Sequence, residues 1–296
     1  SCNTTGDDNV AIGHSSMELN TTGSCNNSIG YAALNKNTTG DNNNALGNRA
    51  LWSNTTGTQN NVIGCCSMYS NISGDYNNAM GARALNANIG GHYNNAMGYT
   101  ALYTNTYGTC NNAIGYEALK LNTTGTQNNA IGTQALCSNT TGENNTAMGY
   151  QALYGNTTGC YNTAIGTETL VINTDGCYNT AIGKQALYNN TEGDHNTGIG
   201  QCALKRNTTG CHNTALGNAA LECNTTGEYN TAMGHKALYT SLSGDHNFAA
   251  GQCSLYSNWG GCYNTAIGLN SLKCNTTGCG NIAIGQTYGG ALCKNT

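Results

Sequence analysis

The chain has 296 residues, only 8% of them charged, and a formal net charge of −4. Its ten Lys and Arg form no basic patch, which excludes nucleic acid as an expected partner. No apolar run approaches the roughly 18–20 residues of a membrane helix, so no membrane span is expected. The 16 cysteines favour an oxidising, extracellular location.

From Asn3 onward, one pattern of seventeen residues returns along the chain. Stepping by seventeen from Gly6 meets a glycine every time, as far as Gly278. With the Asn of N-T-T-G as position 1, the consensus is N-T-T-G-x-x-N-x-A-I-G-x-x-A-L-x-x. Position 7 is always Asn and position 11 is always Gly. A fixed short period of this kind predicts a stacked repeat architecture.

We predict an all-β fold: one parallel β-solenoid (β-roll) over residues 1–296, with about seventeen coils starting at residues 3, 20, 37 and every seventeenth residue after that. A unit of seventeen residues is too short for two helices and a turn. Two fixed glycines would also cost a helix about 1 kcal/mol each. Thr, Asn and short apolar pairs between glycines are typical of short strands joined by turns. Neighbouring coils would then lie ~4.8 Å apart.

Each conserved position of the repeat predicts a role. The asparagines at positions 1 and 7 would form ladders of stacked amides along the axis. The glycines at positions 4 and 11 would serve turns that need a positive φ or close backbone approach. The large aliphatics at positions 10 and 15 would point inward from two short strands, with small residues at positions 9 and 14. The position-7 ladder includes Asn9, Asn43, Asn60, Asn77, Asn94, Asn111, Asn128 and Asn162.

Asn-Thr-Thr is also an acceptor for N-glycosylation. Five coils keep the position-1 Asn but lose the acceptor motif, which favours a structural ladder over a sugar signal. Glycans on consecutive coils ~4.8 Å apart would also collide. Candidate acceptors at position 1 are Asn3, Asn20, Asn37, Asn54, Asn71, Asn122, Asn139, Asn156, Asn207, Asn224 and Asn275, and those elsewhere are Asn26, Asn144 and Asn189.

Two cysteine pairs are candidate disulfides. Cys160 and Cys177, and likewise Cys262 and Cys279, share position 5 in successive coils. A Cα separation of ~4.8 Å falls within the disulfide range, although stacked side chains are not ideal for a bridge. The adjacent pair Cys65-Cys66 is expected to bond to other columns or chains.

Histidines and tyrosines recur at position 6, where His195, His212 and His246 share a column with several tyrosines. We interpret this column as a row of exposed rings rather than a metal site. No pattern indicates a catalytic group, a metal or a cofactor. The sequence therefore predicts a protein that is not an enzyme.

The repeat G-x-x-N-x-A-I-G-x-x-A-L resembles that of YadA-like head domains in trimeric autotransporter adhesins. It is also similar to the N-T-A-I-G-x-x-A-L-x-x-N-T-T-G arrays of bacterial and phage fibre proteins. Residues 162–176 and 264–278 carry the resemblance most plainly. It implies a left-handed β-roll, three chains side by side, and a surface fibre or adhesin stalk. The seventeen-residue unit, Asn in place of Ser and the many cysteines depart from the adhesin pattern.

A core of two large aliphatics per coil is thin, which predicts self-association as a lateral homotrimer or an end-to-end filament. Near residues 286–290 a three-residue insertion interrupts the pattern. Neither end shows a cap, so a segment of a longer array is expected.

We predict an extracellular structural fibre or stalk at a cell or virion surface, with an adhesive role and glycans as further partners. The alternative is a ligand-binding solenoid, either a carbohydrate-binding adhesin head or an ice-binding protein. The adjacent threonines of N-T-T-G point to opposite faces, which disfavours ice binding.

Overall fold

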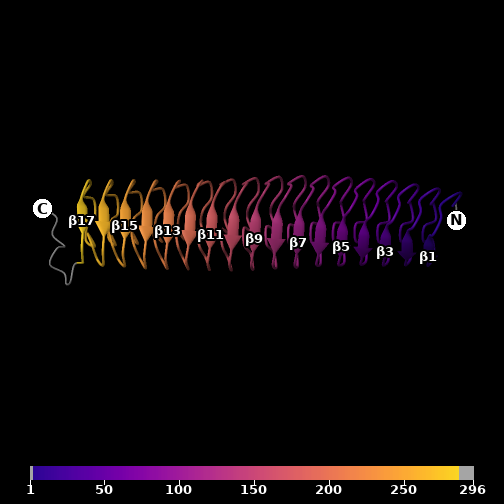
Figure 1. The fold of residues 1–296 in the computed structure, drawn as a ribbon, viewed down its shortest axis with the longest axis horizontal. Helices are drawn as coiled ribbons and strands as arrows, with labels where there is room; N and C mark the ends of the chain where they lie inside the picture. Colours follow the sequence, from indigo (N-terminus) through magenta and orange to yellow (C-terminus); the bar gives the residue numbers. More distant parts are fainter. Residues whose placement is uncertain (1–2, 287–296) are drawn as a thin grey trace. The chain divides into compact units, whose positions relative to one another are not determined.

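The structure, a computed structural model, describes residues 3–286 and divides into two compact units, Ser1–Met148 and Gly149–Thr296. Within each unit, every repeat forms one coil with one short strand, and successive strands lie side by side (Figure 1). The predicted all-β parallel solenoid with seventeen-residue coils is confirmed. The part of the chain that the structure describes contains no helix long and apolar enough to cross a membrane.

All strands are three residues long. The strands of the N-terminal unit are β1 (Val10–Ile12), β2 (Asn27–Ile29), β3 (Asn44–Leu46), β4 (Asn61–Ile63), β5 (Asn78–Met80), β6 (Asn95–Met97), β7 (Asn112–Ile114), β8 (Asn129–Ile131) and β9 (Thr146–Met148). Those of the C-terminal unit are β10 (Thr163–Ile165), β11 (Thr180–Ile182), β12 (Thr197–Ile199), β13 (Thr214–Leu216), β14 (Thr231–Met233), β15 (Phe248–Ala250), β16 (Thr265–Ile267) and β17 (Ile282–Ile284).

The strands pair in parallel with a register equal to the repeat. Asn44 of β3 lies opposite Asn61 of β4, and Thr180 of β11 lies opposite Thr197 of β12. Equivalent positions therefore stack on one another along the axis of each unit. This register turns each position of the repeat into a continuous column of side chains.

The large aliphatic side chain at position 10 points outward, so its predicted place in the core is wrong. Ile63 and Met148 are 44% and 40% exposed, whereas the preceding Val62 and Ala147 are fully buried. Successive side chains of a strand point to opposite sides. Because the Asn at position 7 is buried, positions 8 and 10 must face out. Position 9 then fills the interior, which explains why it is usually Ala.

The second predicted strand is also absent from the described coils: the Leu at position 15 lies in a turn. Leu102 has a φ of 51° and Leu187 also 51°, and both side chains are fully buried. The left-handed backbone conformation is costly for residues with a Cβ. Inter-coil hydrogen bonds hold it in place: the Leu102 N–H donates to the Ala118 carbonyl (3.0 Å). One column of Leu and two of mostly Ala therefore form the apolar half of the interior.

The two fixed glycines meet different requirements. Gly98, at position 11, has a φ of 144°. Gly91, at position 4, has no such φ, but a Cβ there would lie 2.4 Å from the carbonyl oxygen of Gly108 in the next coil. Both predicted reasons for glycine are thus present, one at each position. The predicted insertion at 286–290 lies outside the described residues except for Gln286.

Candidate functional surface

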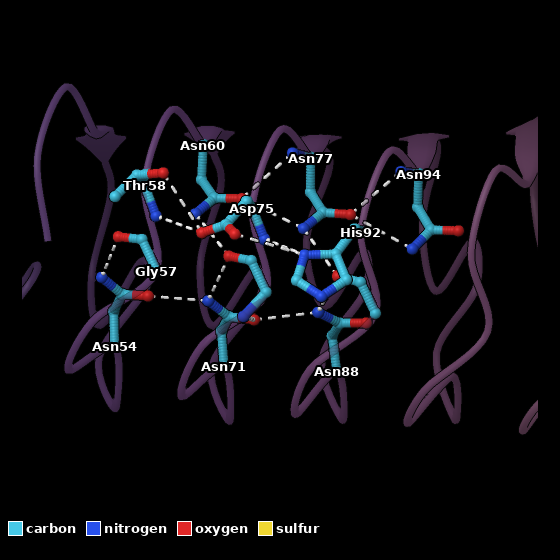
Figure 2. A network of polar contacts seen from close by, with 12 residues as sticks. Asn54, Gly57, Thr58, Asn60, Asn71, Asp75, Asn77, Asn88, His92 and Asn94 are labelled. Carbon is cyan, nitrogen blue, oxygen red and sulfur yellow. Dashed lines mark hydrogen bonds and ion pairs between the residues drawn. The ribbon is translucent and has the colours of Figure 1, made fainter.

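Two ladders of asparagine side chains fill the polar half of the interior. At position 1, Asn71 Nδ2 donates to Asn54 Oδ1 (2.7 Å) and to the Gly74 carbonyl of its own coil (3.0 Å). At position 7, Asn77 Nδ2 donates to Asn60 Oδ1 (3.1 Å) and to the Gly91 carbonyl (2.9 Å). Figure 2 shows both rows in neighbouring coils. The predicted asparagine ladders are confirmed.

Each rung of the position-7 ladder makes further bonds that tie it to the backbone. The Asn77 N–H donates to Asn60 Oδ1 (3.0 Å), so one side-chain oxygen accepts two bonds from the next coil. The Gly91 carbonyl accepts from both Asn77 and Asn88, which joins the two ladders. Buried amides are costly unless their donors and acceptors are paired, and here they are paired at almost every coil. These buried hydrogen bonds therefore hold the backbone that carries the outer side chains.

One rung of the position-1 ladder is defective. Ser241 replaces the Asn in the C-terminal unit, and its Oγ is buried without a hydrogen-bond partner. The Asn224 Oδ1 in the preceding coil likewise has no donor. A serine side chain is too short to bridge to the next coil. Among the described side chains, only Thr100 Oγ1 is in the same condition.

The outer face of the strands is the surface on which function can be sought. Exposure alternates from position 6 to position 10, so positions 6, 8 and 10 present three parallel columns to solvent. Position 10 is an apolar column of Ile, Leu and Met in both units, apart from Ala250. Position 8 is mostly Asn in the N-terminal unit and mostly Thr in the C-terminal one. A long apolar column beside a polar one is unusual for the exposed face of a parallel sheet.

The asparagines of position 8 form an outer ladder in the N-terminal unit. Asn27 Nδ2 donates to Asn44 Oδ1 (2.8 Å), and Asn78 Nδ2 donates to Asn95 Oδ1 (2.7 Å). The threonines at this position in the C-terminal unit, Thr163 to Thr231, are half-buried and have no side-chain amide with which to form such a ladder. The two units therefore expose the same backbone with different polar chemistry.

Position 6 of the C-terminal unit carries seven aromatic rings in an unbroken stack. Their centroids are 4.7–5.0 Å apart and their planes differ by 1–6°. The rings are those of Tyr161, Tyr178, His195, His212, Tyr229, His246 and Tyr263. Neighbouring rings cover both faces of the five inner rings, so a sugar could stack only on the outer faces of the end rings, Tyr161 and Tyr263.

The column at position 5 explains why the candidate disulfides do not form. Its side chains accept a backbone hydrogen bond from the preceding coil: the Thr58 N–H donates to Asp75 Oδ1 (2.7 Å), as drawn in Figure 2. Cys177 Sγ accepts from the Cys160 N–H (3.1 Å), and Cys279 Sγ accepts from the Cys262 N–H (3.1 Å).

Cys177, Cys262 and Cys279 are free thiols, so neither predicted bridge between successive coils is present. The prediction rested on the Cα separation and noted that stacked side chains are not ideal for a bridge, and in the structure the in-register side chains point the same way along the axis. Each sulfur bonds to a backbone N–H instead of meeting the sulfur of the next coil. Cys65 and Cys66 are also free thiols, so neither bonds to another column of this chain, and their predicted bonds to other chains stay a prediction.

Most candidate glycan acceptors are buried. A glycan replaces one hydrogen of Nδ2, and at the buried Asn71 this amide already donates to Asn54 of the preceding coil and to Gly74 of its own coil. By exposure, glycosylation is compatible with the fold at Asn3, which is exposed, and at the half-buried Asn144 and Asn189. The buried acceptors are Asn20, Asn26, Asn37, Asn54, Asn71, Asn122, Asn139, Asn156, Asn207, Asn224 and Asn275.

No protein-family model matches the chain, and no curated protein shows significant sequence similarity to it. The resemblance to YadA-like head repeats therefore stays a prediction. Among the described residues, no group of three or more His, Cys, Asp or Glu is placed to hold a metal ion. The outer face of the strands, with its columns at positions 6, 8 and 10, is the candidate functional surface.

Proposed function

We propose that this chain is a structural segment of an extracellular fibre or stalk, and that copies associate through the outer strand face. The supporting observation is the apolar column at position 10, which repeats in nearly every coil of both units. Side chains such as Met97 and Ile131 are 42% and 37% exposed. Burying each against another chain would contribute roughly 1 kcal/mol, so several coils together can stabilise an assembly.

The regular spacing of the coils along the axis favours a partner whose side chains repeat at the same spacing. Columns spaced at ~4.8 Å fit best against columns of equal spacing, and a second copy of this chain provides them. A lateral homotrimer would use this face, whereas an end-to-end filament would not and is the alternative assembly. Adhesion and glycan decoration would belong to the exposed side chains and not to the interior.

Sedimentation and electron microscopy of the purified chain test the proposal. We expect oligomers or filaments in which several solenoids lie side by side. The triple variant Ile114→Lys, Ile131→Lys, Met148→Lys should sediment as a monomer, because it places charge on three consecutive apolar rungs of the outer face. Its folding should be retained, since these side chains are already exposed.

The matched control is Tyr107→Lys, Thr124→Lys, Thr141→Lys, which adds the same charge at exposed position 3. It should assemble like the unmodified chain. A chain that stays monomeric at every concentration, with no filaments in micrographs, would contradict the proposal.

A second candidate function is ice binding, favoured by the threonine column at position 8. Five successive strands, β10 to β14, begin with an outward Thr, in register with one another. This column is different from the N-T-T-G threonines that disfavoured the idea. Thermal hysteresis that is lost in Thr197→Lys and retained in Asn95→Lys would support ice binding. An absence of thermal hysteresis would remove this candidate.

A further inference from the structure

The adjacent cysteines Cys65 and Cys66 form a pair of thiols that the proposed function does not use. They occupy positions 12 and 13 of one coil, where β4 has ended. Their Sγ atoms lie 3.5 Å apart, and both are free. Cys65 is exposed and Cys66 is half-buried, so the pair is open to solvent on one side.

Hydrogen bonds to neighbouring coils fix the backbone of this pair. The Cys66 N–H donates to the Asn48 carbonyl (2.9 Å), and the Cys65 carbonyl accepts from the Arg83 N–H (3.0 Å). The Cys66 carbonyl accepts from Asn86 Nδ2 (2.7 Å). The two thiols are therefore held on a rigid turn, with little conformational entropy to lose on binding a ligand.

Two arginines flank the pair along the axis. Arg49 and Arg83 occupy the same position as Cys66 in the preceding and following coils. Burial raises the pKa of the Cys66 thiol, while the charges of Arg49 and Arg83 act in the opposite direction. The two positive charges offset only part of this rise, so the pKa of the Cys66 thiol stays above its ordinary value.

A disulfide within the pair is disfavoured by geometry. Adjacent Cα atoms across a trans peptide are about 3.8 Å apart, below the disulfide range of about 4.4–6.8 Å. Bringing the sulfurs to bonding distance would also distort the turn that the three backbone contacts hold. The pair is instead suited to bind one thiophilic atom through both sulfurs.

The distance between the two Sγ atoms limits which thiophilic atom they can bind together. With centre–sulfur bonds of about 2.3 Å, as in zinc thiolates, a 3.5 Å separation subtends an angle of roughly 100°. A linear two-coordinate ion would need the sulfurs roughly 4.6 Å apart. Structural zinc needs four ligands, and no third His, Cys, Asp or Glu of the described residues joins this pair. A pyramidal trivalent centre with two sulfur ligands and one organic group fits the angle.

We propose that Cys65 and Cys66 form a bidentate binding site for a thiophilic trivalent centre, of the class of monosubstituted arsenicals. In the reaction, two sulfur–arsenic bonds form, while two S–H bonds and the two arsenic–oxygen bonds of the hydrated arsenical break. Two molecules of water leave, and no electrons are transferred. The organic group on arsenic projects into solvent on the exposed side of Cys65.

The test uses the reduced chain of residues 1–296 and phenylarsine oxide, followed by intact mass and peptide mapping. One adduct per chain is expected on the peptide that contains both cysteines. It should survive an excess of a monothiol and be removed by 1,2-ethanedithiol, because only a dithiol replaces both sulfur bonds at once. Cys137 is not expected to react, since burial raises the pKa of its thiol to about 11.

Single variants decide whether both sulfurs are needed. Cys65→Ser and Cys66→Ser should each lose the monothiol-resistant adduct, while Cys110→Ser, at an exposed cysteine, should keep it. Circular dichroism checks that each variant is folded. A resistant adduct that persists in both single variants, that maps to the position-5 cysteines, or that never forms would overturn the proposal.

Discussion

The N-terminal and C-terminal units have the same kinds of interior column and differ on the outer face of their strands. Both bury Asn at positions 1 and 7, Ala at position 9 and Leu at position 15. Outside, Asn27 to Asn129 begin the strands of the N-terminal unit, whereas Thr163 to Thr231 begin those of the C-terminal one. The contrast teaches that buried hydrogen bonds restrict the inner columns to one residue type, while an exposed column needs only a side chain compatible with a strand.

Glycine substitutions should show the largest effect, and equally in both units. We expect Gly91→Ala and Gly261→Ala to lower the free energy of unfolding by about 3 kcal/mol or more, measured by urea denaturation. In each case the new Cβ would lie 2.4 Å from a carbonyl oxygen of the next coil. That oxygen belongs to the backbone and cannot move aside.

The preceding residues are matched controls. At Gly260 the nearest atom to a new Cβ is 3.9 Å away, and at Gly90 it is 3.3 Å away on a tyrosine ring. Gly260→Ala and Gly90→Ala should change stability by less than about 0.5 kcal/mol. Equal losses at both glycines of a pair would show that close coil contact is not the reason for position 4.

Asparagine substitutions should separate the inner columns from the outer one. We expect Asn77→Ala to destabilise by about 3 kcal/mol, because it removes the acceptor of the buried Asn94 N–H and Nδ2 and one of the two donors to the Gly91 carbonyl. Its neighbour Asn78 belongs to the exposed ladder, so Asn78→Ala should cost about 1 kcal/mol or less.

The same contrast is expected between Asn213→Ala and Thr214→Ala in the C-terminal unit. Urea midpoints of all four variants provide the measurement. If the exposed and buried substitutions of a pair proved equally costly, the division between inner and outer columns would fail.

The sequence alone predicted the period, the parallel solenoid and the asparagine ladders, because each follows from repetition at a fixed position. It misplaced position 10, since hydrophobicity alone suggested an inward direction. The correct signal was available: Asn26 at position 7 and Ile29 at position 10 are three residues apart, so an inward Asn forces an outward Ile.

Other features depend on three-dimensional detail that a repeat pattern does not contain. The Leu at position 15 was correctly expected inside, but its left-handed turn was not foreseen. The direction of the Cys177 side chain also depends on which backbone N–H of the neighbouring coil lacks a partner. For the same reason, the contact between the sulfurs of Cys65 and Cys66 could not be read from their adjacency.

Repair of the interrupted ladder should stabilise the C-terminal unit. Ser241→Asn restores a donor for Asn224 Oδ1 and removes a buried hydroxyl without a partner. We expect a gain of about 1–2 kcal/mol in the free energy of unfolding. Ser243→Asn, at an exposed position of the same coil, should be neutral. A destabilised Ser241→Asn variant would indicate that this coil has adapted its packing to the smaller side chain.

Exchange of the outer residues should have the smallest effect, and it should differ between the units. Asn78→Thr loses two exposed amide hydrogen bonds but gains a residue that strands favour, so we expect a net change within about 0.5 kcal/mol. Thr197→Asn loses strand propensity and finds no amide in Thr180 or Thr214 above and below it. It should therefore destabilise by about 0.5 kcal/mol.

The triple exchange Thr180→Asn, Thr197→Asn, Thr214→Asn completes two rungs of an amide ladder and should recover most of that loss. Differential scanning calorimetry of the three variants measures the effect. Recovery would mean that an outer asparagine is favourable only when its neighbours are also asparagine, which explains why each unit keeps largely to one residue type on this column. A triple variant that loses three times the single effect would show instead that the outer amide bonds contribute nothing in water.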